Sequence, residues 1–234
     1  MEKIHVLGDE KMQLVHLDLQ ELPLFRDISA AEVDRFIENT GAVIKRYERG
    51  SRFLKAYEAN SNIGVIVEGE AQVLSEDRFG NEAISHNLER GAMLGSTSAI
   101  LPKVPYTTNI EALTDVLVLW VPYRALLTAG PKLGRTHGIV MKNLLEAFCR
   151  KNLLMMEKIE LLSQKTLRER LILYLLQRER RQNREKVHVP GRVQLAKELE
   201  CNRSALTREI SAMRNEGMLA CGADWMQLDK DKIG

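Results

Sequence analysis

The sequence predicts an α+β protein with an N-terminal antiparallel β-roll, a long central helix, and a C-terminal pair of short helices followed by a small β-hairpin. Three observations support this fold class. Short strand-like runs broken by turn residues fill residues 43–121, helical apolar spacing without proline fills residues 133–162, and two short helical patterns lie between residues 192 and 217. The predicted domains are therefore residues 1–132, 133–162 and 163–234.

Length and composition place the chain among ordinary globular proteins. It has 234 residues, of which 44% are hydrophobic and 28% charged. No apolar run reaches the roughly 18 residues of a membrane span, and the charged N-terminus has no apolar stretch typical of a signal peptide. Cys149, Cys201 and Cys221 are widely spaced and form no CxxC pair, which indicates free thiols. We therefore expect a cytoplasmic protein that does not contact a membrane.

The N-terminal half predicts a short helix and then a β-roll. Ser29 and Glu32 form a capping box for a helix over residues 29–39. The runs VIKRYERGS, SNIGVIVEGEAQVL, GNEAISHNL and DVLVLWV alternate apolar and polar residues, as half-buried strands do. Gly80-Asn81 separates two of these runs and predicts a hairpin turn. Strands about ten residues apart, with no long helix between them, favour an all-β roll or sandwich.

The central helix, predicted over residues 133–162, carries a heptad seam. Its seam positions alternate steps of four and three residues and are Met141, Leu145, Phe148, Asn152, Met155, Ile159 and Leu162. A buried Asn at an a-type position fixes register and favours a parallel pair of helices. A second apolar stripe, containing Val140 and Leu144, can pack on the β-roll. The seam predicts a homodimer; a core helix of a monomer with one exposed Asn is the alternative.

Basic charge and helical patterns gather in the last third. Residues 163–234 hold 15 Lys and Arg against 10 Asp and Glu, whereas residues 1–162 hold 19 against 22. Thr166 and Glu169 form another capping box, ahead of the helical run LRERLILYLLQRER. The patterns RVQLAKELE and NRSALTREISAMRNE then meet at Glu200-Cys201, with Gly217 ending the second helix and MLACGADWMQLD forming a possible wing. A basic end of this kind suggests a nucleic-acid module.

The helix pair matches the helix-turn-helix pattern. Ala196 is small where two helices approach, a turn follows at Glu200, and Leu206 is apolar on the second helix. Polar residues then occupy the outer face of the second helix, where a recognition helix meets the major groove of DNA. The predicted DNA-binding residues are Arg192, Asn202, Arg203, Ser204, Thr207 and Arg208, with Arg192 on a phosphate. A generic amphipathic helix hairpin is the alternative.

The chain as a whole resembles the Crp/Fnr family of bacterial transcription regulators. The resemblance covers about residues 22–228 and rests on PLFRDISAAEVDRF, YERGS, NIGVIVEGEAQV, TLRERLILYLL and above all LAKELECNRSALTREISAMRNEGML. It implies a cyclic-nucleotide-binding-like jelly roll, a winged helix-turn-helix, and base reading by Arg203 and Arg208. It also implies double-stranded DNA with an inverted-repeat operator, a second copy of the chain, and RNA polymerase as partners. Ser204 replaces the usual Glu of the family, which leaves the half-site sequence open.

The effector region departs from the cyclic-nucleotide binders of this family. They carry a Glu for the ribose and an Arg for the phosphate, where this chain has Ser96 and Thr107. Because burying a cyclic phosphate without a cation is costly, we expect a different, partly hydrophobic small-molecule effector. By position, the predicted effector residues are Gly95, Ser96, Thr97, Thr107, Thr108, Met155 and Met156.

Metal and catalytic motifs are not recognisable in the sequence. The iron–sulfur members of the family need N-terminal cysteines, so no iron–sulfur cluster is expected, and the five histidines show no ligand spacing. His86 or a methionine could ligate haem, although the family's haem motif is missing. Glu68 and Glu70 indicate a polar strand end more readily than a carboxylate pair. No nucleophile elbow, P-loop or GxGxxG occurs, so an enzyme is not expected.

These observations predict a dimeric DNA-binding transcription regulator that responds to an unidentified small molecule. Two alternatives stay open. One is a regulator that does respond to a cyclic nucleotide, and the other is a dimeric small-molecule-binding protein whose helix-turn-helix pattern is accidental.

Overall fold

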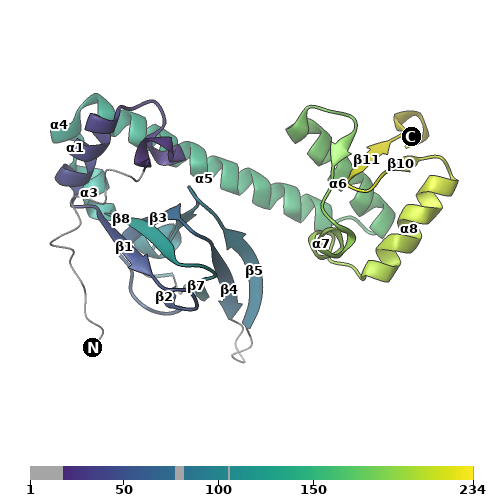
Figure 1. Cartoon of the computed structure of the whole chain (residues 1–234), viewed down its shortest axis with the longest axis horizontal. Coiled ribbons are helices and arrows are strands. Elements are labelled where there is room, and N and C mark those ends of the chain that lie inside the picture. Colours follow the sequence, from purple (N-terminus) through teal and green to yellow (C-terminus); the bar gives the residue numbers. More distant parts are fainter. Residues whose placement is uncertain (1–17, 77–81, 105, 234) are drawn as a thin grey trace. The chain divides into compact units, whose positions relative to one another are not determined.

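The computed structural model describes residues 18–76, 82–104 and 106–233. The predicted turn at Gly80-Asn81 and the histidines His5 and His16 lie outside these residues. The described residues form two compact units, one up to residue 148 and the other from residue 149 onward (Figure 1).

The first unit combines two β-sheets with several helices. Its helical elements are η3 (Leu19–Glu21), η4 (Pro23–Phe25), α1 (Ala30–Thr40), α2 (Ser96–Ile100), α3 (Tyr123–Thr128), α4 (Gly130–Leu133) and the first half of α5 (Arg135–Leu162). Its strands are β1 (Val43–Tyr47), β2 (Arg52–Leu54), β3 (Asn62–Glu68), β4 (Ala71–Glu76), β5 (Glu82–Leu88), β6 (Met93–Leu94), β7 (Thr108–Ala112) and β8 (Val116–Pro122). The sheets have the orders β1-β8-β3-β6 and β2-β7-β4-β5, and every pairing is antiparallel.

Strand β8 shows how one run of residues serves two cores. Val116, Val118 and Trp120 face the second sheet and pack with residues such as Val73 and Ile110. Leu117, Leu119 and Val121 point the other way, toward the core formed with α1 and the start of α5. Because side chains alternate along a strand, a continuous apolar run is buried on both faces. The first sheet is therefore a layer between the helices and the second sheet.

The predicted helix caps and most predicted strands are confirmed. The capping box of Ser29 and Glu32 precedes α1, and that of Thr166 and Glu169 precedes the helix that starts at Leu167. Strands β2, β6 and β7 were not predicted, since β2 and β6 have only three and two residues and the buried Asn109 disguises the pattern of β7. Such short strands depend on their neighbours in the sheet rather than on local patterning.

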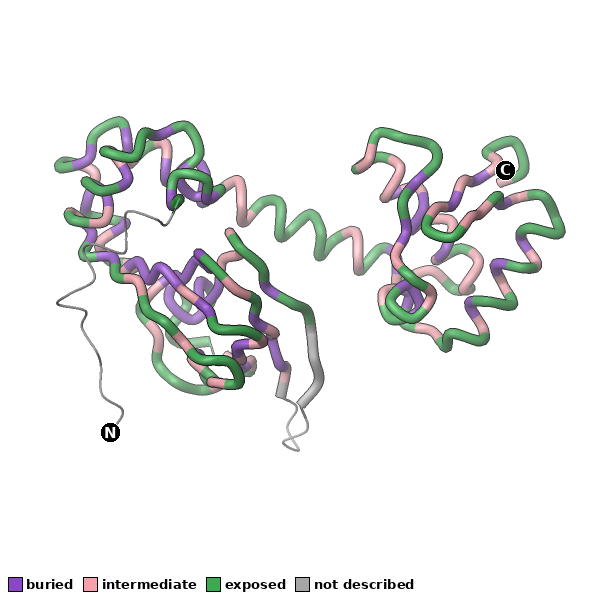
Figure 2. Tube along the Cα trace, in the orientation of Figure 1, coloured by how far each residue is buried: buried purple, intermediate pink, exposed green. Residues whose placement is uncertain are grey.

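The long helix begins two residues later than predicted. Gly134 has φ 53° and ψ −123°, outside the helical region, so α4 ends at Leu133 and α5 starts at Arg135. Val140 and Leu144 are buried in the core of the first unit. Leu161 is buried in the core of the second unit, whereas residues 149–156 are exposed (Figure 2).

The second unit holds the end of α5, α6 (Leu167–Gln182), α7 (Arg192–Glu198), α8 (Arg203–Asn215), η5 (Lys230–Lys232) and a small sheet. The sheet has the order β10-β11-β9, from β10 (Leu219–Cys221), β11 (Trp225–Leu228) and β9 (Val187–His188). The predicted two-stranded wing therefore exists, and β9 adds a third strand. One core, centred on fully buried residues such as Leu171, Leu195 and Leu206, joins these elements.

Candidate functional site

The helix pair α7–α8 is held by a small apolar contact surface. Leu195 and Ala196 of α7 are buried, as are Leu206, Ile210 and Met213 of α8. The tight turn between the helices contains Glu200 in a left-handed conformation, with φ 49°. A buried stripe on one side of α8 leaves its other side free to carry polar residues.

The exposed face of α8 brings together the residues predicted to bind DNA. Asn202, Arg203, Ser204, Thr207 and Arg208 are all exposed within the first two turns of the helix. Thr207 donates a hydrogen bond to the carbonyl of Arg203, which keeps it close to the helix. Among the described residues, no hydrogen bond or ion pair engages the guanidinium groups of Arg203 and Arg208. Two exposed, unpaired cations therefore occupy this face.

Arg192 is placed differently from these residues. It opens α7 and is half-buried, with its guanidinium nitrogens 4.0 Å from Met226 Sδ and 3.9 Å from Cys221 Sγ. The side chain therefore spans from α7 to the strands of the wing. Its predicted phosphate contact stays a prediction.

Sequence reasoning missed the ion cluster behind α8. Arg168 of α6 donates to Glu209 at 2.6 Å and makes two hydrogen bonds of 2.6 and 2.8 Å to Glu216. These carboxylates raise the pKa of Arg168 above its ordinary value, and the guanidinium lowers the pKa of Glu216. Glu209 and Glu216 are seven residues apart, so the helical repeat places both toward one partner. The cluster fixes the orientation of α8 on α6.

The predicted effector residues of the β-roll lie at the start of α2 and at the start of β7. Gly95 precedes α2 with φ 67°, Ser96 is buried, and Thr97 is exposed. Thr107 is exposed, and the hydroxyl oxygen of Thr108 is buried without a hydrogen-bond partner in the described residues. The structure therefore brings the two predicted stretches into one unit.

A polar contact and an aromatic cluster flank this region. The side-chain Nδ2 of Asn60 donates to the carbonyl of Gly95 at 2.9 Å and to Ser98 Oγ at 3.0 Å. Trp120 donates to the Tyr47 hydroxyl at 2.9 Å, and Tyr47 stacks on Phe53 with ring centroids 4.5 Å apart. Burial raises the pKa of Tyr47, which keeps this hydroxyl neutral. Aromatic and apolar groups therefore pack together between the sheets.

Met155 and Met156 belong to the second unit, where these residues are 56% and 60% exposed. Neither unit alone therefore contains the whole predicted effector set. Their assignment to the effector region stays a prediction.

The predicted dimer seam is only partly covered. Met141 and Phe148 are half-buried and pack against the core of the first unit, while Leu162 is half-buried in the second. Leu145, Asn152, Met155 and Ile159 are exposed. Three of these four exposed residues are apolar, and the pairing of the seam with a second helix stays a prediction.

Within the described parts of the chain, no group of three or more His, Cys, Asp or Glu residues could hold a metal ion. Cys149 is exposed, and Cys201 and Cys221 are half-buried free thiols. None of the helices in the described residues is both long enough and apolar enough to span a membrane.

Comparison with known proteins places these features in a known fold. Residues 44–129 match the cyclic nucleotide-binding domain family. The catabolite activator protein of Thermus thermophilus is 20% identical, with 90% of this chain and 95% of that chain covered and a TM-score of 0.51. The fold of this chain is that of the catabolite activator protein. CprK complexed with OCPA has a similar fold, with 13% identity, 83% of this chain and 91% of that chain covered and a TM-score of 0.62.

A curated relative matches the N-terminal part alone. The cAMP-dependent protein kinase regulatory subunit of Mycosarcoma maydis is 31% identical over 94 residues. The match covers 40% of this chain and 17% of the kinase subunit. It supports a cyclic nucleotide-binding fold for the β-roll of this chain.

Proposed function

We propose that this protein is a dimeric DNA-binding transcription regulator of the Crp/Fnr type, controlled by a small molecule other than a cyclic nucleotide. The observation that carries the DNA-binding part is the pair of unpaired cations Arg203 and Arg208 on the exposed face of α8. Arg is the side chain best suited to bidentate contacts with guanine in the major groove. The helix pair and wing of the second unit supply the rest of the recognition module.

Dimerisation would present two copies of α8 to successive major grooves, about 34 Å apart. The operator is then an inverted repeat with half-site centres about one helical turn apart. RNA polymerase is the further partner that the resemblance implies.

Selection of duplexes from a random-sequence pool tests DNA binding directly. We expect the full-length protein to enrich an inverted repeat, and Arg203→Ala and Arg208→Ala each to lose about 1–3 kcal/mol of binding with relaxed preference at the contacted base pair. Arg214→Ala is the matched control, because Arg214 is also exposed but lies in the last turn of α8. Unchanged sequence ranking in both Arg203 and Arg208 variants would refute the recognition-helix assignment.

Failure of the wild-type protein to enrich any duplex favours the alternative, a dimeric small-molecule-binding protein. If the protein binds DNA through phosphate contacts alone, its affinity should depend strongly on salt concentration, and the selection should enrich no sequence motif.

The effector proposal rests on Ser96 and Thr107, which stand where the cyclic-nucleotide binders carry Glu and Arg. Neither residue carries a charge that could pair with a cyclic phosphate, so we propose a neutral or weakly acidic, partly hydrophobic molecule. Calorimetry with cyclic AMP and cyclic GMP should show a dissociation constant no lower than about 1 mM, which corresponds to a binding free energy of about −4 kcal/mol. Low-micromolar binding of either nucleotide would establish the alternative, a cyclic-nucleotide-responsive regulator.

A further inference from the structure

The turn that joins α7 to α8 leaves three backbone carbonyl groups without partners from the helices themselves. Helix α7 ends at Glu198, and the amide groups of Leu199, Glu200 and Cys201 bond back to the carbonyls of residues 195–197. The carbonyls of Glu198, Leu199 and Glu200 receive no such bond in the described residues. Carbonyls at a helix end carry partial negative charge and favour cations.

Two cations from other helices bind these carbonyls. Lys158 Nζ of α5 donates to the Glu198 carbonyl at 2.6 Å and lies 3.6 Å from the Glu200 carboxylate. Arg170 Nη1 of α6 donates to the Leu199 carbonyl at 2.8 Å and contacts the Glu200 carbonyl at 3.4 Å. The turn of the helix pair is therefore fixed from outside by α5 and α6.

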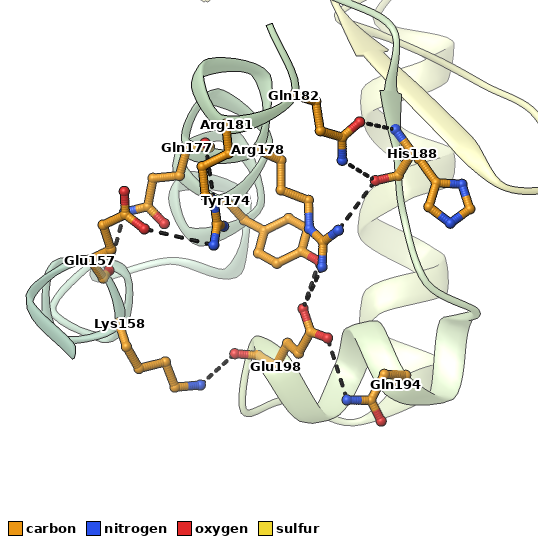
Figure 3. Close-up of polar contacts among 10 residues, drawn as sticks. All are labelled: Glu157, Lys158, Tyr174, Gln177, Arg178, Arg181, Gln182, His188, Gln194 and Glu198. Carbon is orange, nitrogen blue, oxygen red and sulfur yellow. Dashed lines mark hydrogen bonds and ion pairs between the residues drawn. The ribbon is translucent and has the colours of Figure 1, made fainter. Parts of the chain in front are cut away.

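The end of α5 is itself fixed within the second unit, so the backbone that carries Lys158 is already in place for its hydrogen bond to the turn. Leu161 is buried in the core of this unit. Gln177 of α6 donates to the Glu157 carbonyl at 3.1 Å, and Arg181 pairs with the Glu157 carboxylate at 3.8 Å (Figure 3). Both anchors lie within one helical turn of Lys158, so its backbone has little freedom.

The side chain of Glu198 reinforces the same turn. Its carboxylate accepts from the Tyr174 hydroxyl at 2.6 Å and pairs with Arg178 at 3.2 Å (Figure 3). Tyr174 and Arg178 both belong to α6. The Glu198 backbone thus contacts α5 while its side chain contacts α6, and α7 is held between the two.

We infer that Lys158 is a positioning residue for DNA recognition: it ties the turn of the helix pair to the end of α5 and so sets the orientation from which α8 meets DNA. The inference rests on the proposed function. Lys158 acts through the Glu198 carbonyl and not through a phosphate. A displacement of the end of α5 would therefore reach the helix pair through this contact.

Three full-length variants test this role. Lys158→Met removes the ammonium group but keeps an unbranched side chain, and Lys158→Arg restores a cation that can donate to the carbonyl. Lys151→Met is the matched control, because Lys151 is an exposed lysine of α5 without a hydrogen bond or ion pair in the described residues. Both methionine variants remove the same charge.

Binding to the selected operator is measured at a temperature where each variant is fully folded. We expect Lys158→Met to weaken binding at least fivefold, with Lys158→Arg and Lys151→Met within twofold of wild type. The salt slope of Lys158→Met should equal that of Lys151→Met, since loss of a phosphate contact lowers the slope by about one unit. Equal affinities for the two methionine variants, or a reduced slope confined to Lys158→Met, would overturn the inference.

Hydrogen exchange without DNA separates this inference from the proposed function. In Lys158→Met the amides of residues 199–201 should exchange at least fivefold faster than in the wild type, while the amides of α6 keep their wild-type rates. In Lys151→Met the amides of residues 199–201 should also keep their wild-type rates. Unchanged exchange in Lys158→Met overturns the inference, whether or not DNA binds. If the wild type enriches no duplex but exchange is faster in Lys158→Met, the proposed function is rejected. The inference that Lys158 fixes the turn is then still supported.

Discussion

Glu32 shows how one side chain can join a local signal to a tertiary contact. Its carboxylate accepts hydrogen bonds from the Ser29 amide and hydroxyl, both at 2.8 Å, and from Thr136 of α5 at 2.9 Å. The bond from the Ser29 amide, followed by those from the two hydroxyl groups, lowers the pKa of Glu32 to about 2. The capping box was predictable from the sequence, whereas Thr136 lies 104 residues away.

The lowered pKa of Glu32 predicts a pH dependence of stability. Glu32 binds a proton more weakly in the folded chain than in the unfolded one, where its pKa is near 4.5. Its contribution is therefore complete above about pH 4.5 and is lost as the pH falls toward 2. We expect Glu32→Gln to lower the free energy of unfolding at pH 7 but to have little effect at pH 2.

Urea unfolding of the first unit, followed by Trp120 fluorescence in a Trp225→Phe background, measures this effect. Glu38→Gln is the control, because Glu38 lies exposed on the same helix without a hydrogen bond or ion pair in the described residues. Equal pH profiles for the two Gln variants would contradict the assigned role of Glu32.

At the scale of elements, strand β3 depends on a glycine for close packing rather than for an unusual φ. Gly64 pairs with Leu94 of β6 on one side and Trp120 of β8 on the other. A Cβ at this position would lie 2.6 Å from a Leu94 methyl and 2.9 Å from the Trp120 ring. Neither side chain can withdraw easily, because both are buried in the core between the sheets.

Gly64→Ala is therefore expected to destabilise the first unit by about 1–3 kcal/mol, as overpacking does. Gly138→Ala, in α5, has open space around the new Cβ and should stabilise the helix by about 1 kcal/mol. Urea denaturation of the two variants measures both effects. A Gly64→Ala protein at least as stable as wild type would disprove the packing argument.

At the scale of the whole molecule, the exposed stripe of α5 favours a second copy of the chain as partner. Leu145 is 59% exposed and Ile159 is 63% exposed, on the same predicted seam as Asn152. Large apolar groups repeated at heptad spacing are typical of a helix that pairs with another.

We expect the wild-type protein to sediment as a dimer at micromolar concentration, and Leu145→Asp to raise the dimer dissociation constant roughly a hundredfold, since a charge would enter the apolar seam. Leu127→Asp is the control, because Leu127 is 57% exposed on α3 and outside the seam. Asn152→Leu should instead stabilise the assembly while loosening its register or oligomeric state. A monomeric wild type would rule out the seam.

The amino-acid sequence by itself determined the features that depend on local patterning. Two capping boxes, the long helix, the alternating strands and the helix pair follow from the spacing of apolar and polar residues within short windows. The exposed polar residues between positions 202 and 208 could likewise be predicted from the sequence, because helical periodicity separates their face from that of Leu206 and Ile210.

Only the tertiary structure decided which distant residues meet. Strands β2, β6 and β7 form through pairing with neighbours, and the break at Gly134 depends on a backbone conformation that glycine permits but does not require. The contacts of Lys158 with Glu198 and of Arg168 with Glu216 join residues 40 and 48 positions apart. Such pairs leave no periodic signal along the chain, because their partners are brought together by the packing of whole helices.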